Sequence, residues 1–306
     1  MTRTIKPTLI RQLALILIAV IILTCAVSCG RDEPPLKYED IPAYSGQPYV
    51  EINGNVPFFT RDELVVDAYE RYSHLDVLGR CGVAIACIGR EIMPTEEREG
   101  LSSVNPTGLI YNGKSNNNQY SFIDNGYLYN RCHLIGFQLA GENANEKNLI
   151  TGTRYFNIEG MLPFENMVAD HVKGAGGHVM LRVTPYYVGY DFVARGVLME
   201  GYSVEDNGES VCFCVFVYNV QPGVIIDYYT GENRLDMNSD YSEEDVTVTL
   251  TYVLNKNSRK YHLPDCYHAK SMKAEYRIEY DGSVAAFENV YPSYTPCGSC
   301  KPNEYK

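Results

Sequence analysis

The segment from Tyr129 to Asn157 carries the side chains best suited to chemistry. It reads YNRCHLIGFQLAGENANEKNLITGTRYFN and contains one histidine, two arginines and five asparagines, with few acidic residues. The planar fork of an arginine suits phosphate oxygens, and its charge lowers the pKa of a nearby imidazole. His133, close to Arg131, would then be neutral at pH 7 and able to accept a proton. A lone histidine is more often structural, but these neighbours favour a general base.

Asparagines that could hold a metal ion follow the histidine. Asn148 and Asn157 stand on either side of the run LITGTRYF, which contains Arg154. An asparagine oxygen is a hard ligand that Mg²⁺ accepts, and this ion binds few protein groups and keeps most of its water. Because a neutral ligand leaves the double charge of the ion for a phosphate, the scarcity of carboxylates fits phosphodiester chemistry.

The elements that must position these residues are mainly strands. Strand-like runs occur at residues 78–88, 178–185, 187–199, 211–217 and 246–254. Helical patterns occur at Thr60–Tyr72 and Pro163–Val172. The second pattern places these side chains on one face: Phe164, Met167, Val168, His171 and Val172. Mixed strands with few helices predict an α+β domain built on a mostly antiparallel sheet.

The whole stretch YNRCHLIGFQLAGENANEKNLITGTRYFNIEGMLPFENMVADHV resembles the ββα-metal DNA/RNA non-specific endonuclease family, in its branch of secreted streptococcal DNases and DNA-entry nucleases. The resemblance extends over Tyr49–Leu235 and includes LDVLGRCGVAIACIGREIMPTEER and YNVQPGVIIDYYTGE. It implies an α+β fold in which a ββα-metal site lies against a central, mostly antiparallel sheet.

The resemblance also implies a role for each residue of the site. His133 takes the place of the general base, and Asn157 that of the sole protein ligand of Mg²⁺, or of Mn²⁺. Arg131 takes the place of a phosphate-binding arginine, and Asn148 that of an asparagine that supports the base. Glu165 would orient water at the metal. Arg154 and Arg80 would contact the phosphate or the transition state.

One difference from the family signature Asp-Arg-Gly-His lies in the site itself. Here the four residues are Asn130, Arg131, Cys132 and His133. The loss of the aspartate removes one charge, and Cys132 puts a side chain where glycine allows close approach of the backbone. Asn157 and Glu165 are about two helical turns apart, so both can line one face if a helix begins near Asn157.

The implied mechanism is one-metal hydrolysis. His133 takes a proton from water, the hydroxide attacks phosphorus in line, and the metal stabilises charge on the leaving 3′ oxygen. The products carry a 5′-phosphate and a 3′-hydroxyl. Phosphate contacts carry no base identity, so little sequence preference is expected on DNA, or on RNA as a further substrate.

Two other classes of function remain open. A catalytically silent nuclease fold could capture DNA at the cell surface as a binding or uptake lipoprotein, although such a fold has no need for His133 and Asn157. A cysteine hydrolase with Cys132 as nucleophile is disfavoured, because adjacent residues rarely orient correctly as nucleophile and base.

The N-terminus has the pattern of an export signal. Arg3, Lys6 and Arg11 precede an apolar run from Leu13 to Val27, which is short for a membrane span of roughly 20 residues. The following AVSCG resembles a bacterial lipoprotein processing site, with Cys29 as the lipid-anchored first residue on the outer face of the membrane. An uncleaved anchor helix is the alternative. Loss of the signal takes the net charge from −12 to about −15, which excludes a general attraction to nucleic acid.

A second cluster of candidate ligands lies near the C-terminus. His262, Cys266, Cys297 and Cys300 have the paired spacing of a closed, tetrahedral Zn²⁺ site. The unit resembles the small zinc-binding domain of the Ada DNA-repair protein, and His268 is a substitute ligand. A disulfide between Cys297 and Cys300 is the alternative in an oxidising compartment.

Composition shifts divide the chain into four parts. We expect a lipoprotein signal peptide at residues 1–28, a tether at 29–44, the endonuclease domain at 45–250 and the zinc-binding domain at 251–306. Of the other cysteines, Cys81, Cys87, Cys212 and Cys214 lie in apolar runs, where buried free thiols are expected. The oligomeric state does not follow from the sequence.

Overall fold

The computed structural model describes residues 34–124, 126–241, 246, 247, 249–264, 266–283, 287 and 290–300. The chain forms two compact units, Met1–Pro35 and Leu36–Lys306. The predicted signal peptide and Cys29 lie outside the described residues, so the lipid anchor stays a prediction. Among the residues that are described, no helix has the length and apolar character needed to cross a membrane.

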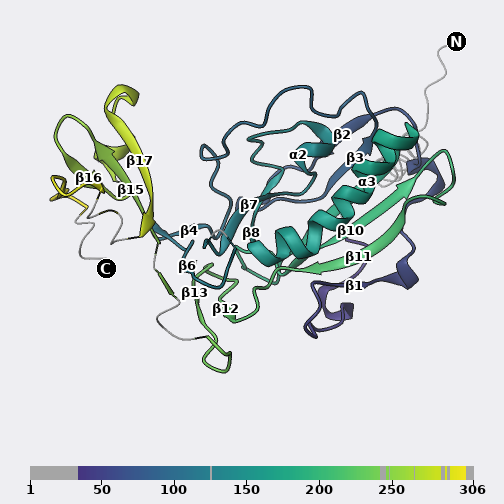
Figure 1. Cartoon of the computed structure of the whole chain (residues 1–306), viewed down its shortest axis with the longest axis horizontal. Helices are drawn as coiled ribbons and strands as arrows, with labels where there is room; N and C mark the ends of the chain where they lie inside the picture. The colour runs from purple at the N-terminus through teal and green to yellow at the C-terminus, as the bar shows by residue number, and fades with distance from the viewer. Residues whose placement is uncertain are drawn as a thin grey trace, which may run out of the picture. The chain divides into compact units, whose positions relative to one another are not determined.

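A six-stranded antiparallel sheet forms the core of the second unit (Figure 1). Its strands, in spatial order, are β1 (Tyr49–Glu51), β11 (Cys212–Tyr218), β10 (Gly196–Ser203), β9 (Val179–Tyr186), β3 (Ala84–Ile88) and β2 (Tyr69–Tyr72). The central strands β9, β10 and β11 are buried along almost their whole length. Because both faces of the sheet are covered, these strands consist of nearly continuous apolar residues. The predicted antiparallel α+β fold is confirmed.

A two-stranded ribbon followed by a helix lies against this sheet. Strand β7 (Tyr129–His133) pairs with β8 (Leu149–Thr153), and the chain then enters a π-helical segment, η4 (Phe156–Met161), which leads into α3 (Leu162–Ala175). Pro163 lies directly after the π-helical segment in a continuous helix, where its missing N–H removes one backbone hydrogen bond. Figure 1 shows α3 lying across β10 and β11. This arrangement is the predicted ββα element.

The packing of α3 explains its position. Phe164, Val168 and Val172 are buried in the main core cluster, and the ring of Phe164 lies 4.9 Å from that of Phe213 in β11. Burial of three such side chains contributes roughly 1.5–3 kcal/mol each. The predicted apolar face is wrong in part, because Met167 is 42% exposed.

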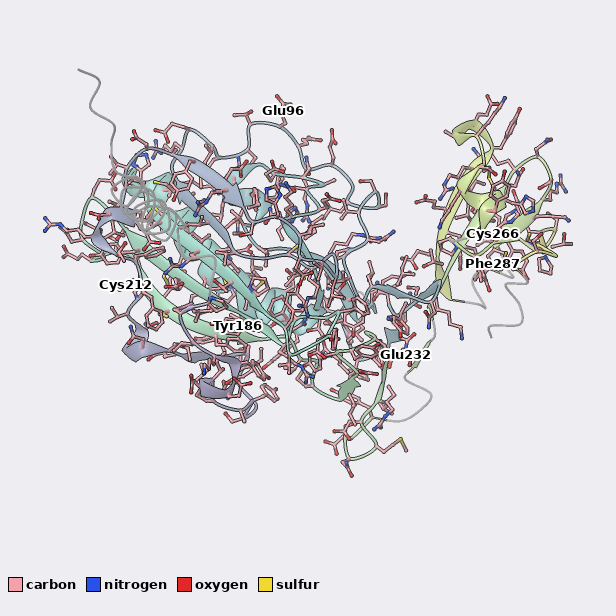
Figure 2. All side chains as sticks on the ribbon, turned by 180° about the vertical axis from the view of Figure 1, so that it is seen from behind. Glu96, Tyr186, Cys212, Glu232, Cys266 and Phe287 are labelled. Atoms are coloured by element: carbon pink, nitrogen blue, oxygen red, sulfur yellow. The ribbon has the colours of Figure 1, made fainter. Side chains whose placement is uncertain are left out.

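A separate four-stranded sheet lies near the C-terminus, in the order β17 (Arg277–Ser283), β15 (Thr249–Asn255), β16 (Lys260–His262) and β18 (Thr295–Pro296). Figure 2 shows Cys266 and Phe287 in this region, and Tyr186 and Cys212 on the large sheet. Phe287 packs against Tyr252 and Tyr261 in a small core of its own. This sheet lies within the second compact unit, so the separate C-terminal domain and its boundary at residue 251 stay predictions.

The remaining elements are short. The helices are η1 (Tyr38–Asp40), η2 (Asn53–Asn55), η3 (Arg61–Glu63), α2 (Phe137–Ala140), α4 (Tyr267–Lys270) and η6 (Ala274–Tyr276). The strands are β4 (Ile110–Tyr111), β5 (Lys114–Ser115), β6 (Gln119–Tyr120), β12 (Val224–Ile226), β13 (Asn233–Leu235) and β14 (Val246–Thr247).

The predicted helix Thr60–Tyr72 is wrong. Thr60 and Glu63 form a capping box, but the helical turn that they begin ends at Glu63. The chain then extends, and Tyr69–Tyr72 pairs with β3 as an edge strand. Glu63 also accepts a hydrogen bond from the buried Arg182 at 2.9 Å. These tertiary contacts override a local helical pattern.

The free thiols agree with the prediction for the apolar runs. Cys81, Cys87 and Cys214 are buried, Cys212 is partly buried, and none of them forms a disulfide within the described residues. Burial raises the pKa of the Cys81 thiol to about 12. These cysteines behave as small apolar residues of the sheet.

Candidate active site

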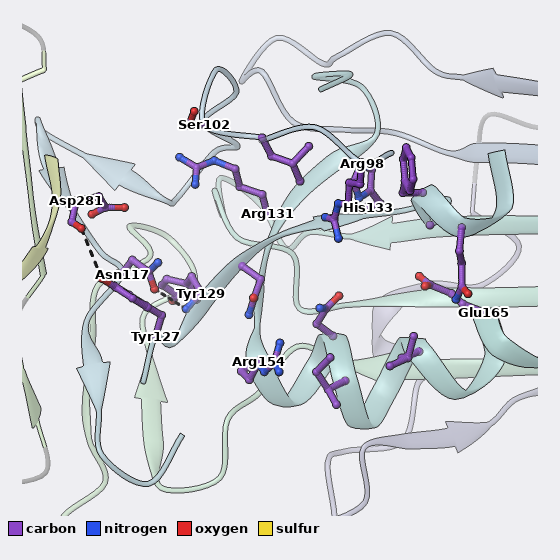
Figure 3. A pocket seen from close by; sticks show the side chains of 18 residues that line it. Arg98, Ser102, Asn117, Tyr127, Tyr129, Arg131, His133, Arg154, Glu165 and Asp281 are labelled. Atoms are coloured by element: carbon purple, nitrogen blue, oxygen red, sulfur yellow. Dashed lines mark hydrogen bonds between the residues drawn. The ribbon is translucent and has the colours of Figure 1, made fainter. Parts of the chain in front are cut away.

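A polar cavity of about 670 Å³ collects most of the predicted site residues (Figure 3). The alternation of side chains along strand β7 explains how Arg131 and His133 reach the same cavity. Successive side chains of a strand point to opposite faces, so Arg131 and His133 both line the cavity while Cys132 points into the core, where it is 1% exposed. Burial raises the pKa of the Cys132 thiol far above its ordinary value. The arrangement excludes Cys132 as a nucleophile for His133.

The imidazole of His133 is held in one orientation. Its Nε2 lies 2.8 Å from the carbonyl oxygen of Asn143, which can only accept a hydrogen bond. Nε2 therefore carries the proton, and Nδ1 is left as the acceptor, as a general base requires. The side chain is 6% exposed, and burial lowers its pKa. The positive charge that adds to this effect belongs to Arg98, which corrects the expectation that Arg131 supplies it.

Asn157 and Glu165 line the same cavity as His133. Asn157 lies in η4 and Glu165 lies on α3, and consecutive helical segments bring both side chains to this one cavity. The two side chains offer one neutral and one acidic oxygen donor around a roomy polar space. This donor set fits a hydrated Mg²⁺ ion, which keeps several waters and takes one or two protein oxygens.

Glu165 is a buried acid at the wall of this cavity. Its side chain is 9% exposed, and burial raises its pKa to about 7, against the opposing effects of a hydrogen bond with Gln138 and the charge of Arg98. Gly136 lines the cavity beside it, and a Cβ atom there would come within 2.6 Å of a Glu165 carboxylate oxygen. Glycine at this position therefore leaves the space that the carboxyl group occupies.

Unpaired donors mark where an anion could bind. Arg154 pairs with Asp124 through one terminal nitrogen at 2.7 Å, but its Nε is buried without a hydrogen-bond partner among the described residues. Nδ2 of Asn130 is likewise buried without a hydrogen-bond partner among the described residues. Arg154 and Asn130 both line the cavity. A buried donor without a partner costs roughly 1–3 kcal/mol, so a bound phosphate would relieve the cost.

Arg131 also lines the cavity (Figure 3), and its phosphate contact stays a prediction. Its Nε donates to the carbonyl oxygen of Val104 at 2.6 Å, and one terminal nitrogen donates to Oδ1 of Asn105 at 2.8 Å. These two bonds fix the plane of the guanidinium group and engage only part of its donors.

Two predicted residues lie outside the cavity. Asn148 is fully buried, and its amide group bonds to both backbone groups of Ile135, at 2.8 Å to N–H and 3.0 Å to C=O. It therefore fixes the chain just after His133, and its supporting role stays a prediction. Arg80 pairs with Asp76 at 2.7 Å and stacks on Tyr187, so the geometry gives its predicted phosphate contact no support.

The cavity-lining residues that the sequence analysis missed include Arg98, Gln138 and Asp281. Arg98 stands among glutamates in a loop and resembles a solvated charge run, so no sequence signal identified it. Gln138 lies on the short helix α2, and Asp281 comes from β17, more than a hundred residues away from His133.

The C-terminal cluster forms a second, very different site. The ligand atoms of His262, Cys266, Cys297 and Cys300 all lie within 4.8 Å of one another, and the three cysteines are free thiols. Burial acts to raise the pKa of Cys297, but backbone N–H groups of Cys300 and Ser299 outweigh it and the pKa is lowered. One imidazole nitrogen and three sulfur ligands in this arrangement suit a tetrahedral metal ion. His268 lies outside the cluster, with Nε2 at 3.2 Å from Oγ of Ser299.

The fold and the cleft together define a nuclease with a ββα-metal site. Residues 63–205 match the model of the DNA/RNA non-specific endonuclease family, and this part of the chain is a domain of that family. It is therefore a hydrolase that acts as an endonuclease.

Solved structures of nucleases are similar to this chain. NucA from Streptococcus agalactiae, with a magnesium ion bound, is 25% identical, with a TM-score of 0.55 over 64% of this chain and 91% of NucA. The same protein without metal gives a TM-score of 0.55 at 25% identity, over 65% and 92% of the two chains. Sda1 nuclease with a bound zinc ion is 31% identical over 55% of this chain and 81% of Sda1, with a TM-score of 0.49. A search among curated proteins gave no significant match.

Proposed function

We propose that the protein is an exported, lipid-anchored, Mg²⁺-dependent endonuclease that hydrolyses DNA, and RNA as a further substrate. The single observation that carries this proposal is the meeting of His133, Asn157 and Glu165 around one polar cavity. The magnesium ion in the similar NucA structure supports the choice of metal.

His133 acts as the general base. Nδ1 of the neutral imidazole takes a proton from the attacking water, while the carbonyl of Asn143 holds Nε2–H and keeps the ring oriented. Because the pKa of His133 is lowered by burial, the base is unprotonated at neutral pH. Proton transfer to a positioned base contributes about 10²–10⁴-fold to the rate.

Asn157 would hold the divalent cation and Glu165 would orient water beside it; the cation when bound would supply positive charge to the scissile phosphate and its leaving 3′ oxygen. The phosphate itself is oriented by donors of this chain, with Nε of Arg154 and Nδ2 of Asn130 as buried, unpaired groups at the cavity. Arg98 and Arg131 add charge beside them. The products carry a 5′-phosphate and a 3′-hydroxyl.

All of these donors suit the sugar-phosphate backbone of the substrate, and backbone contacts do not distinguish bases. Low sequence preference is therefore expected. The lipid anchor at Cys29 and the tether at residues 29–44 would hold the enzyme at the outer face of the membrane, a location that rests on the sequence pattern alone. The C-terminal cluster would bind Zn²⁺ as a structural ion.

Replacement of the base tests the proposal. We expect His133→Ala to reduce nicking of supercoiled plasmid by about 10²–10⁴-fold in the presence of Mg²⁺. The matched control is His171→Ala, which removes a partly exposed imidazole on α3 that does not line the cavity. The thermal unfolding of both variants should resemble that of the wild type. Cleavage by His133→Ala near the wild-type rate would remove His133 from its role.

A further inference from the structure

Arg131 stands between two cavities. Beside the cleft that holds His133, a second cavity of about 460 Å³ is lined by residues of β15, β17 and the loop around Asn105. Ser102, Arg131 and Asp281 line both cavities, so the two spaces adjoin at these side chains. A nucleic-acid strand that continues past the reacting phosphate at this end of the cleft would meet Arg131 and Asp281 together.

Asp281 is held at this junction by its own neighbours. The Tyr127 hydroxyl lies 3.5 Å from the backbone carbonyl oxygen of Asp281, and Figure 3 shows the two residues opposite each other at the end of the cleft. The hydroxyl of Thr251 on the adjacent strand donates to Oδ1 of Asp281 at 3.3 Å. The carboxylate is therefore directed by strand pairing between β15 and β17.

The charges of β17 act on Arg131. Burial lowers the pKa of Arg131, and the negative charges of Asp281 and Glu279 oppose this effect. Asp281 is exposed at its outer side, but desolvation by its neighbours raises its pKa, and the charge of Arg131 opposes this effect. Glu279 is already paired with Arg277 at 3.0 Å, which leaves Asp281 as the carboxylate available to Arg131.

From this geometry we infer that Asp281 is a specificity-determining residue of the cleft, which competes with a substrate phosphate for Arg131. A phosphate that binds Arg131 must approach the carboxylate, and two like charges close together raise the free energy of the complex. The C-terminal sheet thus weakens the binding of nucleic-acid strands that extend past Arg131. A small diester that fills only the space between His133 and Asn157 is not subject to this repulsion. The inference rests on the proposed function for its substrate class.

The substitution Asp281→Asn tests this inference, because asparagine keeps the Oδ1 acceptor for Thr251 and removes only the charge. We expect binding of a fluorescein-labelled single-stranded DNA oligonucleotide, measured by anisotropy in the His133→Ala background, to tighten about two- to fivefold. With one more phosphate contact available, the plot of log Kd against log salt should steepen by up to about one. In the otherwise wild-type enzyme, KM for the oligonucleotide should fall while kcat and the cleavage of bis(p-nitrophenyl) phosphate stay unchanged.

Glu275→Gln is the matched control, since it removes the same charge from an exposed site that lines neither cavity. Equal tightening by both variants would assign the effect to net charge and overturn the inference, as would unchanged or weaker binding by Asp281→Asn alone. Because the binding assay needs no cleavage, a tighter complex in a protein that cuts no DNA would refute the proposed activity and keep the inference.

Discussion

The cleft and the C-terminal cluster are both suited to metal ions, but they are built in opposite ways. The cluster gathers four ligand atoms within 4.8 Å of one another and leaves no open position for a substrate. The cleft offers Asn157 and Glu165 at the wall of a cavity of about 670 Å³. A site that completes its coordination with protein atoms stabilises a fold, whereas a site that leaves most positions to water and substrate can do chemistry.

The two sites also treat charge differently. In the cleft, burial pushes groups toward their neutral forms, lowering the pKa of His133 and raising that of Glu165 to about 7. In the cluster, backbone N–H groups lower the pKa of Cys297 and favour its thiolate, the form that binds a metal. Burial nevertheless raises the pKa of Cys300 in the same cluster to about 12, so burial opposes ionisation in both sites.

The largest effect should come from breaking the closed site. We expect the double substitution Cys297→Ser and Cys300→Ser to abolish binding of one Zn²⁺ ion, measured by elemental analysis. Since metal binding and folding are coupled, with apparent free energies of about 10–16 kcal/mol in zinc-finger peptides, β15–β18 should lose protection from hydrogen exchange. The strands of the large sheet should keep theirs. Cys212→Ser is the control, and zinc retained by the double variant would contradict the comparison.

Replacement of Asn157, the neutral ligand of the cleft, should have the next largest effect. This substitution should affect catalysis and leave the fold intact. Asn157→Ala is expected to lower kcat/KM on plasmid DNA by about 10²–10³-fold, because it removes the protein ligand of the cation. Mg²⁺ titration should show weaker binding, with unchanged zinc content. The control is Asn238→Ala, at an exposed asparagine far along the chain, and its kcat/KM should equal that of the wild type. Unaltered dependence on Mg²⁺ would show that Asn157 is not a ligand.

The smallest effect concerns the stability cost of Glu165. In the metal-free protein its pKa is about 7, against an ordinary value of 4.5, so the folded state binds its proton more tightly and stability declines as pH rises from 4.5 through 7. Glu165→Gln carries no such proton. The variant should be more stable than the wild type by about 1–3 kcal/mol at pH 8, and this gain should vanish near pH 4, as measured by urea unfolding.

Activity should respond in the opposite direction, since the amide cannot replace the carboxylate. We expect Glu165→Gln to cleave plasmid more slowly at pH 8, where the wild-type group is charged. A variant that is both active and no more stable at pH 8 would show that the carboxyl group is neither functional nor costly.

Local patterns predicted the ββα element well because its contacts are close in sequence. The alternation of Arg131, Cys132 and His133 along a strand, and the spacing of Asn157 and Glu165 along a helix, are fixed by backbone periodicity. The helix predicted at Thr60–Tyr72 failed because strand pairing with β3 decides that segment. Edge pairing of this kind depends on a partner that the local pattern does not contain.

The sequence by itself determined which residues could be the base, the metal ligand and the cysteine–histidine cluster, because residue type and spacing limit the chemistry available to each. Only the tertiary structure decided that Arg98 and Asp281 join the cleft, that Arg80 does not, and that the carbonyl of Asn143 selects the tautomer of His133. These outcomes depend on loops and strands brought together by the packing of the sheet. Electrostatic and desolvation effects act through space, so they follow from distance and burial rather than from position along the chain.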